Sequence, residues 1–337
     1  MNFFKLRRTK MLDDAVLDHK PQSILTLLLI FYVVFFIGEV ISKIILSVPS
    51  TIWMLTYDGF IDTMREYTNS VVAGNKDDSA VIEFINEMVL SMPSWLTLAT
   101  LISFVGLGAA AIFYCKKFEK RPLSSMGIRK KGAITESLLG LLIGGALISL
   151  TVLFAFLTGS ISIKPNGSFD FMIILFLIGF LIHAFCETTL FFGYFTTSIA
   201  RDYKLSFAIT VGAVMFSLLH GSTEKVSYLL LINTILFGAL LGIYVFKRGD
   251  IWGAFSILGM WNFAGGCIFG GQVNGVDKIP SLFIMEIDTT KALANGGSVG
   301  IEGGLSTTVA LLIAFALIFL LKTKKGEESL SDATEFE

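Results

Sequence analysis

Three polar side chains within apolar segments have the chemistry to hydrolyse an amide bond together. They are Glu187, His220 and Asn262. A carboxylate shielded from bulk water is a stronger base near neutral pH than one in water. A neighbouring histidine can share the proton and orient a water molecule, and an asparagine amide can donate a hydrogen bond to the oxyanion that forms. These residue types therefore indicate hydrolysis by an activated water.

The three residues also agree in depth. At about 1.5 Å per helical residue, they lie roughly 20, 24 and 18 Å from the cytoplasmic ends of their segments. A polar group at this depth is costly to bury, so it indicates a function. The structural alternatives are a protonated glutamate bonded to a backbone carbonyl, an interfacial histidine, and an asparagine that bridges two helices.

His183 lies four residues before Glu187 and therefore on the same helix face. It could hydrogen-bond the carboxylate. It could instead join Glu187 and His220 around a zinc ion, because two histidines and a carboxylate can hold zinc with one position open. A histidine that only packs between helices is the third interpretation. Zinc is the one cofactor that these residues suggest.

The elements that must position these residues are membrane-spanning helices. The chain of 337 residues is 54% hydrophobic and 16% charged, with a mean hydropathy of +0.74. Several apolar runs reach the roughly 20 residues with which a helix crosses a bilayer. The sequence therefore predicts an all-α, polytopic bundle in the lipid bilayer. Eight spans are expected, at residues 23–47, 94–115, 133–157, 170–198, 205–221, 227–246, 251–270 and 305–321.

The charges of the connecting segments predict the orientation of the bundle. Basic residues gather in the N-terminal segment, in alternate connections and after the last span, whereas the first outer loop is acidic. By the positive-inside rule the basic side is cytoplasmic, so both termini are expected there. The chain has a net charge of −1 and no basic patch with interleaved aromatic residues, so nucleic acid is not an expected partner.

The loops and the glycines add further expectations. Apolar residues at helical spacing within 48–92 predict one or two helices on the membrane surface or over the bundle, and the glycine-rich residues 271–304 are expected to form a loop. Glycines four apart at 140/144 and 238/242 predict close helix packing. The chain is expected to divide into a cytoplasmic segment (1–22), a first span with an extracellular amphipathic loop (23–93), the membrane bundle (94–321) and an acidic, disordered cytoplasmic tail (322–337).

Three short motifs give the chain a resemblance to a known family. They are "ETTLFFG" from Glu187, "FSLLH" up to His220 and "LGMWN" up to Asn262. They are similar to the Glu-Glu-x-x-x-Arg-Gly, Phe-x-x-x-His and His-x-x-x-Asn motifs of the CPBP (CAAX protease and bacteriocin-processing, or Abi) family of intramembrane endopeptidases. The resemblance covers about residues 122–310. It implies that Glu187 and His220 activate a water and that Asn262 stabilises the oxyanion.

Three positions depart from the family motifs. Thr188 replaces the second glutamate, Phe192 the arginine and Leu258 the last histidine. A glutamate and an arginine four apart could pair across one helical turn, so their joint replacement by Thr188 and Phe192 is expected to leave the base intact. Leu258 removes an oxyanion donor, a loss worth roughly 10²–10³ in rate in other enzymes. His183 would compensate only if its ring reached the same water.

Three functions therefore stay open. The first is an intramembrane endopeptidase of the glutamic or metallo type, whose substrate is a membrane-associated peptide or protein. The second is a catalytically impaired relative that acts as a scaffold for a membrane-protein partner. The third is a transporter or channel, which the lack of an internal repeat disfavours. In each case we expect a multi-pass protein of a cell membrane, and the glycine-rich loop suggests a bacterial one.

Overall fold

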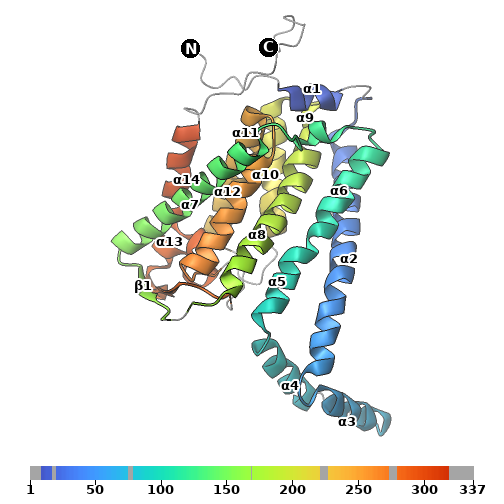
Figure 1. Cartoon of the computed structure of the whole chain (residues 1–337), viewed down its shortest axis with the longest axis vertical. Helices are drawn as coiled ribbons and strands as arrows, with labels where there is room; N and C mark the ends of the chain where they lie inside the picture. Colours follow the sequence, from blue (N-terminus) through green and yellow to red (C-terminus); the bar gives the residue numbers. More distant parts are fainter. Residues whose placement is uncertain are drawn as a thin grey trace, which may run out of the picture.

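Figure 1 shows the computed structural model, a bundle of helices with a pair of shorter helices at its lower end. The structure describes residues 9–16, 20–74, 79–167, 169–220, 227–272 and 279–318, without the side chains of Ala80 and His220. Five of the helical segments are long and apolar enough to cross a membrane. They are α2 (Ile24–Thr56), α5 and α6 together (Ser94–Lys117), α7 (Ala133–Leu157), α8 through α9 (Met172–Ala200) and α11 (Tyr228–Arg248).

The other three predicted spans are shorter helices within the described residues. They are α10 (Leu205–His220), α12 (Trp252–Phe263) and α14 (Leu305–Ile318). Of these, α10 and α14 are shorter apolar helices by length and composition, and α12 is extended by a π-helical stretch, η3 (Ala264–Ile268). The structure is thus a mostly helical bundle, as predicted, with five helices that are long and apolar enough to cross a membrane. The remaining helices are α1 (Lys10–Val16), α3 (Phe60–Val72), α4 (Ser79–Leu90) and α13 (Ala292–Asn295), with short turns η1 (Leu123–Met126), η2 (Thr189–Thr196), η4 (Thr289–Lys291), η5 (Gly297–Val299) and η6 (Ile301–Gly303).

The first span is longer than the sequence predicted. The prediction ended it at residue 47 and began the outer loop there, but α2 continues through Pro49 to Thr56. The apolar run continues beyond the proline, and a helix that continues with it loses one backbone hydrogen bond instead of exposing several carbonyls to lipid. The two helices expected in the loop are present as α3 and α4, at the end of the molecule away from α1 (Figure 1).

Glycines bring α7 and α12 into backbone contact. A Cβ atom added to Gly140 or Gly144 would lie 2.3 or 2.4 Å from a carbonyl oxygen of α12. No side chain fits in such a gap, so the close packing predicted from the glycine spacing is confirmed. The second pair, Gly238 and Gly242 on α11, faces side chains of α10, where an added Cβ would lie 3.1 to 3.2 Å from its nearest neighbours.

A two-stranded antiparallel sheet departs from the all-α prediction. Strand β1 (Ile161–Pro165) pairs with β2 (Phe283–Ile287), with Ile161 opposite Ile287. On the exposed side Lys164 Nζ bonds both carboxylate oxygens of Glu286 at 2.8 Å, and this hydrogen bond lowers the pKa of Glu286. The glycine-rich region was therefore wrongly expected to be loop throughout: it contains β2, α13 and several short turns.

A buried ion cluster joins three elements at the other end of the bundle. Glu119, after α6, accepts from Arg121 Nε at 2.7 Å and from Arg201 Nη2 at 2.6 Å. Arg121 Nη2 also donates to Ser198 Oγ on α9 at 3.1 Å. The three charged side chains are at most 9% exposed. One carboxylate thus holds two guanidinium groups that came from segments far apart in the chain.

The first and last described helices lie at this same end. Helix α1 packs against η1 and α9. The final carbonyl of α14, at Ile318, accepts a hydrogen bond from Lys247 Nζ near the end of α11, at 2.9 Å. The predicted disordered tail 322–337 lies outside the described residues, as do residues 1–8 of the predicted N-terminal segment.

Candidate functional site

Helix α8 carries a buried pair of a histidine and a glutamate. The Nδ1 atom of His183 and the Oε2 atom of Glu187 are 3.5 Å apart, and the two side chains are 4% and 7% exposed. The imidazole ring of His183 stands edge-on against Phe104, with 4.1 Å between ring centroids. The two groups lie on one helix face, as their spacing of four residues predicted, and the phenylalanine packs the ring beside the carboxylate.

Glu187 in the first motif and Asn262 in the third each lie just before a π-helical stretch. The stretch η2 begins two residues after Glu187, and η3 begins two residues after Asn262. In η2 the hydroxyl of Thr196 donates to the carbonyl five residues earlier, at 2.8 Å. Wide turns of this kind occur mostly as single insertions in α-helices, and frequently at functional sites. Each candidate residue thus lies just before a change in the phase of its helix.

His220 is the last residue of α10, and its side chain lies outside the described residues. Contacts along α10 nevertheless show where the end of this helix lies relative to Glu187. The ring of Phe216, one turn earlier, lies 6.0 Å from the ring of Phe192 in η2. Because α8 and α10 run in opposite directions, the end of α10 lies on the side of Phe192 where Glu187 stands. The zinc trio of His183, Glu187 and His220 cannot be assembled from the described side chains, among which no group of three metal-ligating residues occurs.

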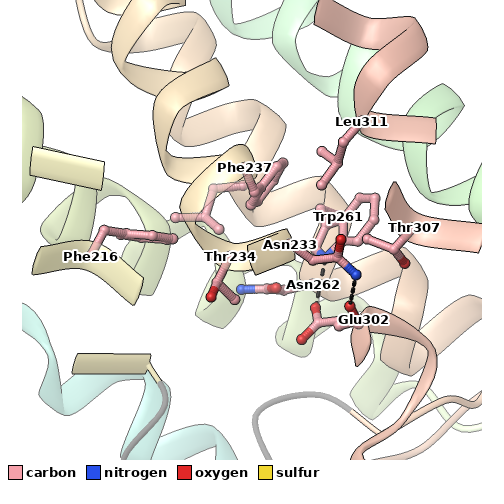
Figure 2. A pocket seen from close by; sticks show the side chains of 10 residues that line it. Phe216, Asn233, Thr234, Phe237, Trp261, Asn262, Glu302, Thr307 and Leu311 are labelled. Atoms are coloured by element: carbon pink, nitrogen blue, oxygen red, sulfur yellow. Dashed lines mark hydrogen bonds between the residues drawn. The ribbon is translucent and has the colours of Figure 1, made fainter. Parts of the chain in front are cut away.

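A small pocket lies between α10, α11, α12, α14 and η6. Its volume is about 30 Å³, enough for on the order of two water molecules. Figure 2 shows its walls, which combine aromatic rings with a few polar groups. The pocket is lined by Phe216, Asn233, Thr234, Phe237, Leu258, Trp261, Asn262, Glu302, Thr307 and Leu311.

Two residues of the third motif line this pocket. Asn262 is 3% exposed, and its Nδ2 atom has no hydrogen-bond partner within the described part of the chain. Buried donors are normally paired with protein or with water, so this amide has a hydrogen bond to give to a molecule in the pocket. Leu258, one turn earlier and 2% exposed, presents only methyl groups at the position of the family's histidine.

The two substituted positions of the first motif are buried in the core. Thr188 is fully buried, and its hydroxyl has no partner among the described residues. Phe192 is also fully buried and packs beside Phe216 and Gly242. An arginine at position 192 would stand among these apolar groups. The phenylalanine fills that space with a ring, and no charge is left there to be paired.

Sequence reasoning did not identify Glu302 as a site residue. Trp261 Nε1 donates to Glu302 Oε1 at 2.6 Å, and Asn233 Nδ2 donates to the backbone carbonyl of Glu302 at 2.7 Å. Figure 2 shows both bonds as dashed lines. The residue lies in "GGSVGIEGGLSTT", which the resemblance to the family covers. Glu302 is the one acidic residue in that stretch, and this could have marked it as a candidate site residue.

The structure thus forms two groups from the predicted residues. His183 and Glu187 lie together on α8, and Leu258 and Asn262 lie together at the pocket with the phenylalanine of the second motif, Phe216. Glu187 does not line this pocket. The depth agreement inferred from the sequence is therefore not accompanied by a shared cavity between Glu187 and Asn262 in the described residues.

Comparison with known proteins supports the resemblance seen in the motifs. The model of one protein family, "Rce1-like: Type II CAAX prenyl endopeptidase Rce1-like", matches residues 169–264. The match begins before His183 and ends after Asn262, so it contains all three motifs. Neither the curated proteins nor the solved structures gave a match. Over residues 169–264 the chain is similar to the Rce1-like type II CAAX prenyl endopeptidases, the family type to which its motifs pointed.

Proposed function

We propose that the protein is an intramembrane endopeptidase that hydrolyses a peptide bond of a membrane-associated peptide or protein. The observation that carries this proposal is Glu187, a carboxylate buried beside His183 within the segment that matches the Rce1-like family. A buried acid in an apolar helix is costly unless it is used. The matching family is described as a type II CAAX prenyl endopeptidase family, which supports peptide hydrolysis as the reaction in which such an acid would act.

In the proposed reaction Glu187 and His220 act on one water molecule. The water gives a proton to this pair, and its oxygen bonds to the carbonyl carbon of the substrate. Asn262 donates to the oxyanion that forms, through the amide nitrogen that has no partner among the described residues. The proton then passes to the departing amine nitrogen as the C–N bond breaks. The substrate must bring Asn262 and the carboxylate to the same carbonyl group, from the pocket on one side and α8 on the other.

The proposed setting is a bacterial cell membrane that the chain crosses eight times, with both termini in the cytoplasm. Five long apolar helices, two shorter ones (α10 and α14) and the buried helix α12 with its extension η3 support this number. The basic connections support the orientation, and the first and last described helices lie at one end of the bundle. A cysteine reporter placed near either end would become labelled from the cytoplasmic side if the orientation is right.

The test is a cleavage assay with the purified full chain in proteoliposomes. The probe is a fluorescent peptide that ends in a prenylated CAAX sequence, the substrate named by the matching family. We expect the wild type to release the terminal residues and Glu187→Gln to lose activity at an unchanged protein level. Retention of activity in Glu187→Gln would overturn the proposal. A parallel assay with a zinc chelator separates the glutamic mechanism from the metal-dependent one.

A second candidate function is a non-catalytic scaffold that binds a membrane-protein partner. Leu258 favours it, because the pocket has a leucine where the family places a hydrogen-bond donor. Under this alternative Glu187→Gln leaves the cellular phenotype intact, whereas substitutions on a lipid-facing side of the bundle remove it. A complementation assay with both kinds of variant distinguishes the two functions.

A further inference from the structure

The loop before α14 places a carboxylate beside the proposed oxyanion donor. Glu302 lies in η6, outside the three family motifs, and lines the same pocket as Asn262 and Leu258. Its side chain is half-buried, and its Oε1 atom lies 2.6 Å from Nε1 of Trp261. Trp261 is the residue immediately before Asn262, so this bond holds the turn of α12 that carries the asparagine.

The backbone of this loop is itself fixed to the bundle. Asn233 Nδ2, on α11, donates to the carbonyls of Glu302 and Gly304 at 2.7 and 3.0 Å, and its Oδ1 atom accepts from Thr308 Oγ1 at 2.6 Å. A Cβ atom on Gly304 would lie 2.3 Å from a backbone oxygen. A loop held by buried hydrogen bonds and close backbone contact keeps its carboxylate at one place. Glu302 is thus a fixed anchor for Trp261.

The ring of Trp261 has a second contact that does not depend on Glu302. It packs on Phe237 of α11, with 5.1 Å between ring centroids. The aromatic contact limits the position of the ring, and the hydrogen bond favours one rotamer of the side chain. Loss of the bond would therefore leave the indole packed but would remove one restraint on the turn of α12 that carries Asn262.

We propose that Glu302 is a positioning residue of the peptidase, which aligns the amide of Asn262 through its hydrogen bond to Trp261. This inference rests on the proposed function and deepens it. Leu258 makes the alignment more important here than in a site with two donors, because Asn262 is the single motif residue that can donate to the oxyanion from this helix. A misplacement of about 1 Å in such a group can cost on the order of 10²-fold in rate.

The test compares Glu302→Ala, Glu302→Gln and Trp261→Phe in the proteoliposome assay with the prenylated peptide. We expect Glu302→Ala and Trp261→Phe each to lower kcat by about 10- to 100-fold with little change in KM, because the donor is misaligned but still present. Glu302→Gln should restore most of kcat, since its amide oxygen still accepts from Trp261. The double variant Glu302→Ala/Trp261→Phe should lose no more than either single variant, because both remove one bond.

Glu286 is an exposed carboxylate on β2, outside the pocket. Glu286→Gln is therefore the matched control and should leave kcat unchanged. Equal kcat in Glu302→Ala and the wild type would overturn the inference, as would additive losses in the double variant. Trp261→Phe keeps the test decisive if Glu302→Ala fails to fold. Full activity in Glu187→Gln is a separate outcome: it overturns the proposed function, and the role of Glu302 in catalysis with it.

Discussion

The Nδ1 atom of His183 lies 3.5 Å from the Oε2 atom of Glu187, one turn further along α8, and both side chains are buried. The contact is between neighbours on one helix, so it does not depend on how α8 packs against the rest of the bundle. Phe104 then covers the imidazole from α5 and α6, at their junction. The carboxylate is thus oriented by its own helix, and any second partner must approach from another one.

A substitution of His183 should therefore weaken catalysis less than a substitution of Glu187. We expect His183→Gln to lower kcat by about tenfold, because the glutamine amide keeps a polar group beside the carboxylate, whereas loss of the base itself costs about 10²–10⁴. Cleavage rates of the two variants, measured side by side with thermal unfolding, check this order. An inactive but folded His183→Gln would mean that the histidine itself moves the proton.

Leucine 258 should limit the rate. Leu258→His would place a second donor one turn from Asn262, at the wall of the same pocket, and we expect kcat to rise by about tenfold or more. Leu311→His is the control, because Leu311 lines the same pocket from α14 but is not part of the third motif. A gain in both variants would show that any imidazole in the pocket suffices, and a gain in neither would exclude the pocket as the oxyanion site.

The contact between α7 and α12 should not tolerate a methyl group. A Cβ on Gly144 would lie 2.4 Å from a backbone oxygen of α12, whereas one on Gly145 would lie 3.5 Å from the flexible end of Met260. We expect Gly144→Ala to lower the free energy of unfolding by about 1–3 kcal/mol. Gly145→Ala should change it by less than about 0.5 kcal/mol. Thermal unfolding in detergent micelles measures both, and equal melting temperatures would contradict the close approach.

The buried ion cluster should depend on its one carboxylate. Glu119→Gln would leave Arg121 and Arg201 without a counter-charge in a buried site, and we expect a loss of about 3–5 kcal/mol in stability. The exposed pair of Asp62 and Arg65, with 3.2 Å between its charged atoms, provides the comparison. Asp62→Asn should leave the melting temperature unchanged, because an exposed ion pair adds little. A stable Glu119→Gln variant would show that water or another group neutralises the cluster.

The sequence was informative wherever a local pattern decides the outcome. Apolar runs predicted the helices, glycine spacing predicted a close helix contact at Gly140 and Gly144, and the four-residue spacing placed His183 on the same helix face as Glu187. The strand pair β1–β2 was missed, because each strand is only five residues long and its partner is far away in the chain. No local pattern shows that two such segments will meet.

Glu302 was missed for a related reason. Its bond to Trp261 joins residues 41 positions apart, and it exists because the path of the loop brings the carboxylate to the end of α12. Glu187 and Asn262 were identified because they lie deep within apolar segments. This criterion could not identify Glu302, which reaches the pocket from a loop. The extension of α2 past Pro49 was missed because a proline is usually taken as the end of a helix.

The glycine contacts of α7 also restrict how the molecule can admit a substrate. Helices whose backbones touch at two successive turns cannot slide or separate without losing all their contact along that line, so α7 and α12 must move as one body. We therefore do not expect a lateral gate at this seam. A peptide arriving from the lipid is therefore expected to pass between other helices, and α10, α11 and α14 are the ones that border the pocket together with α12.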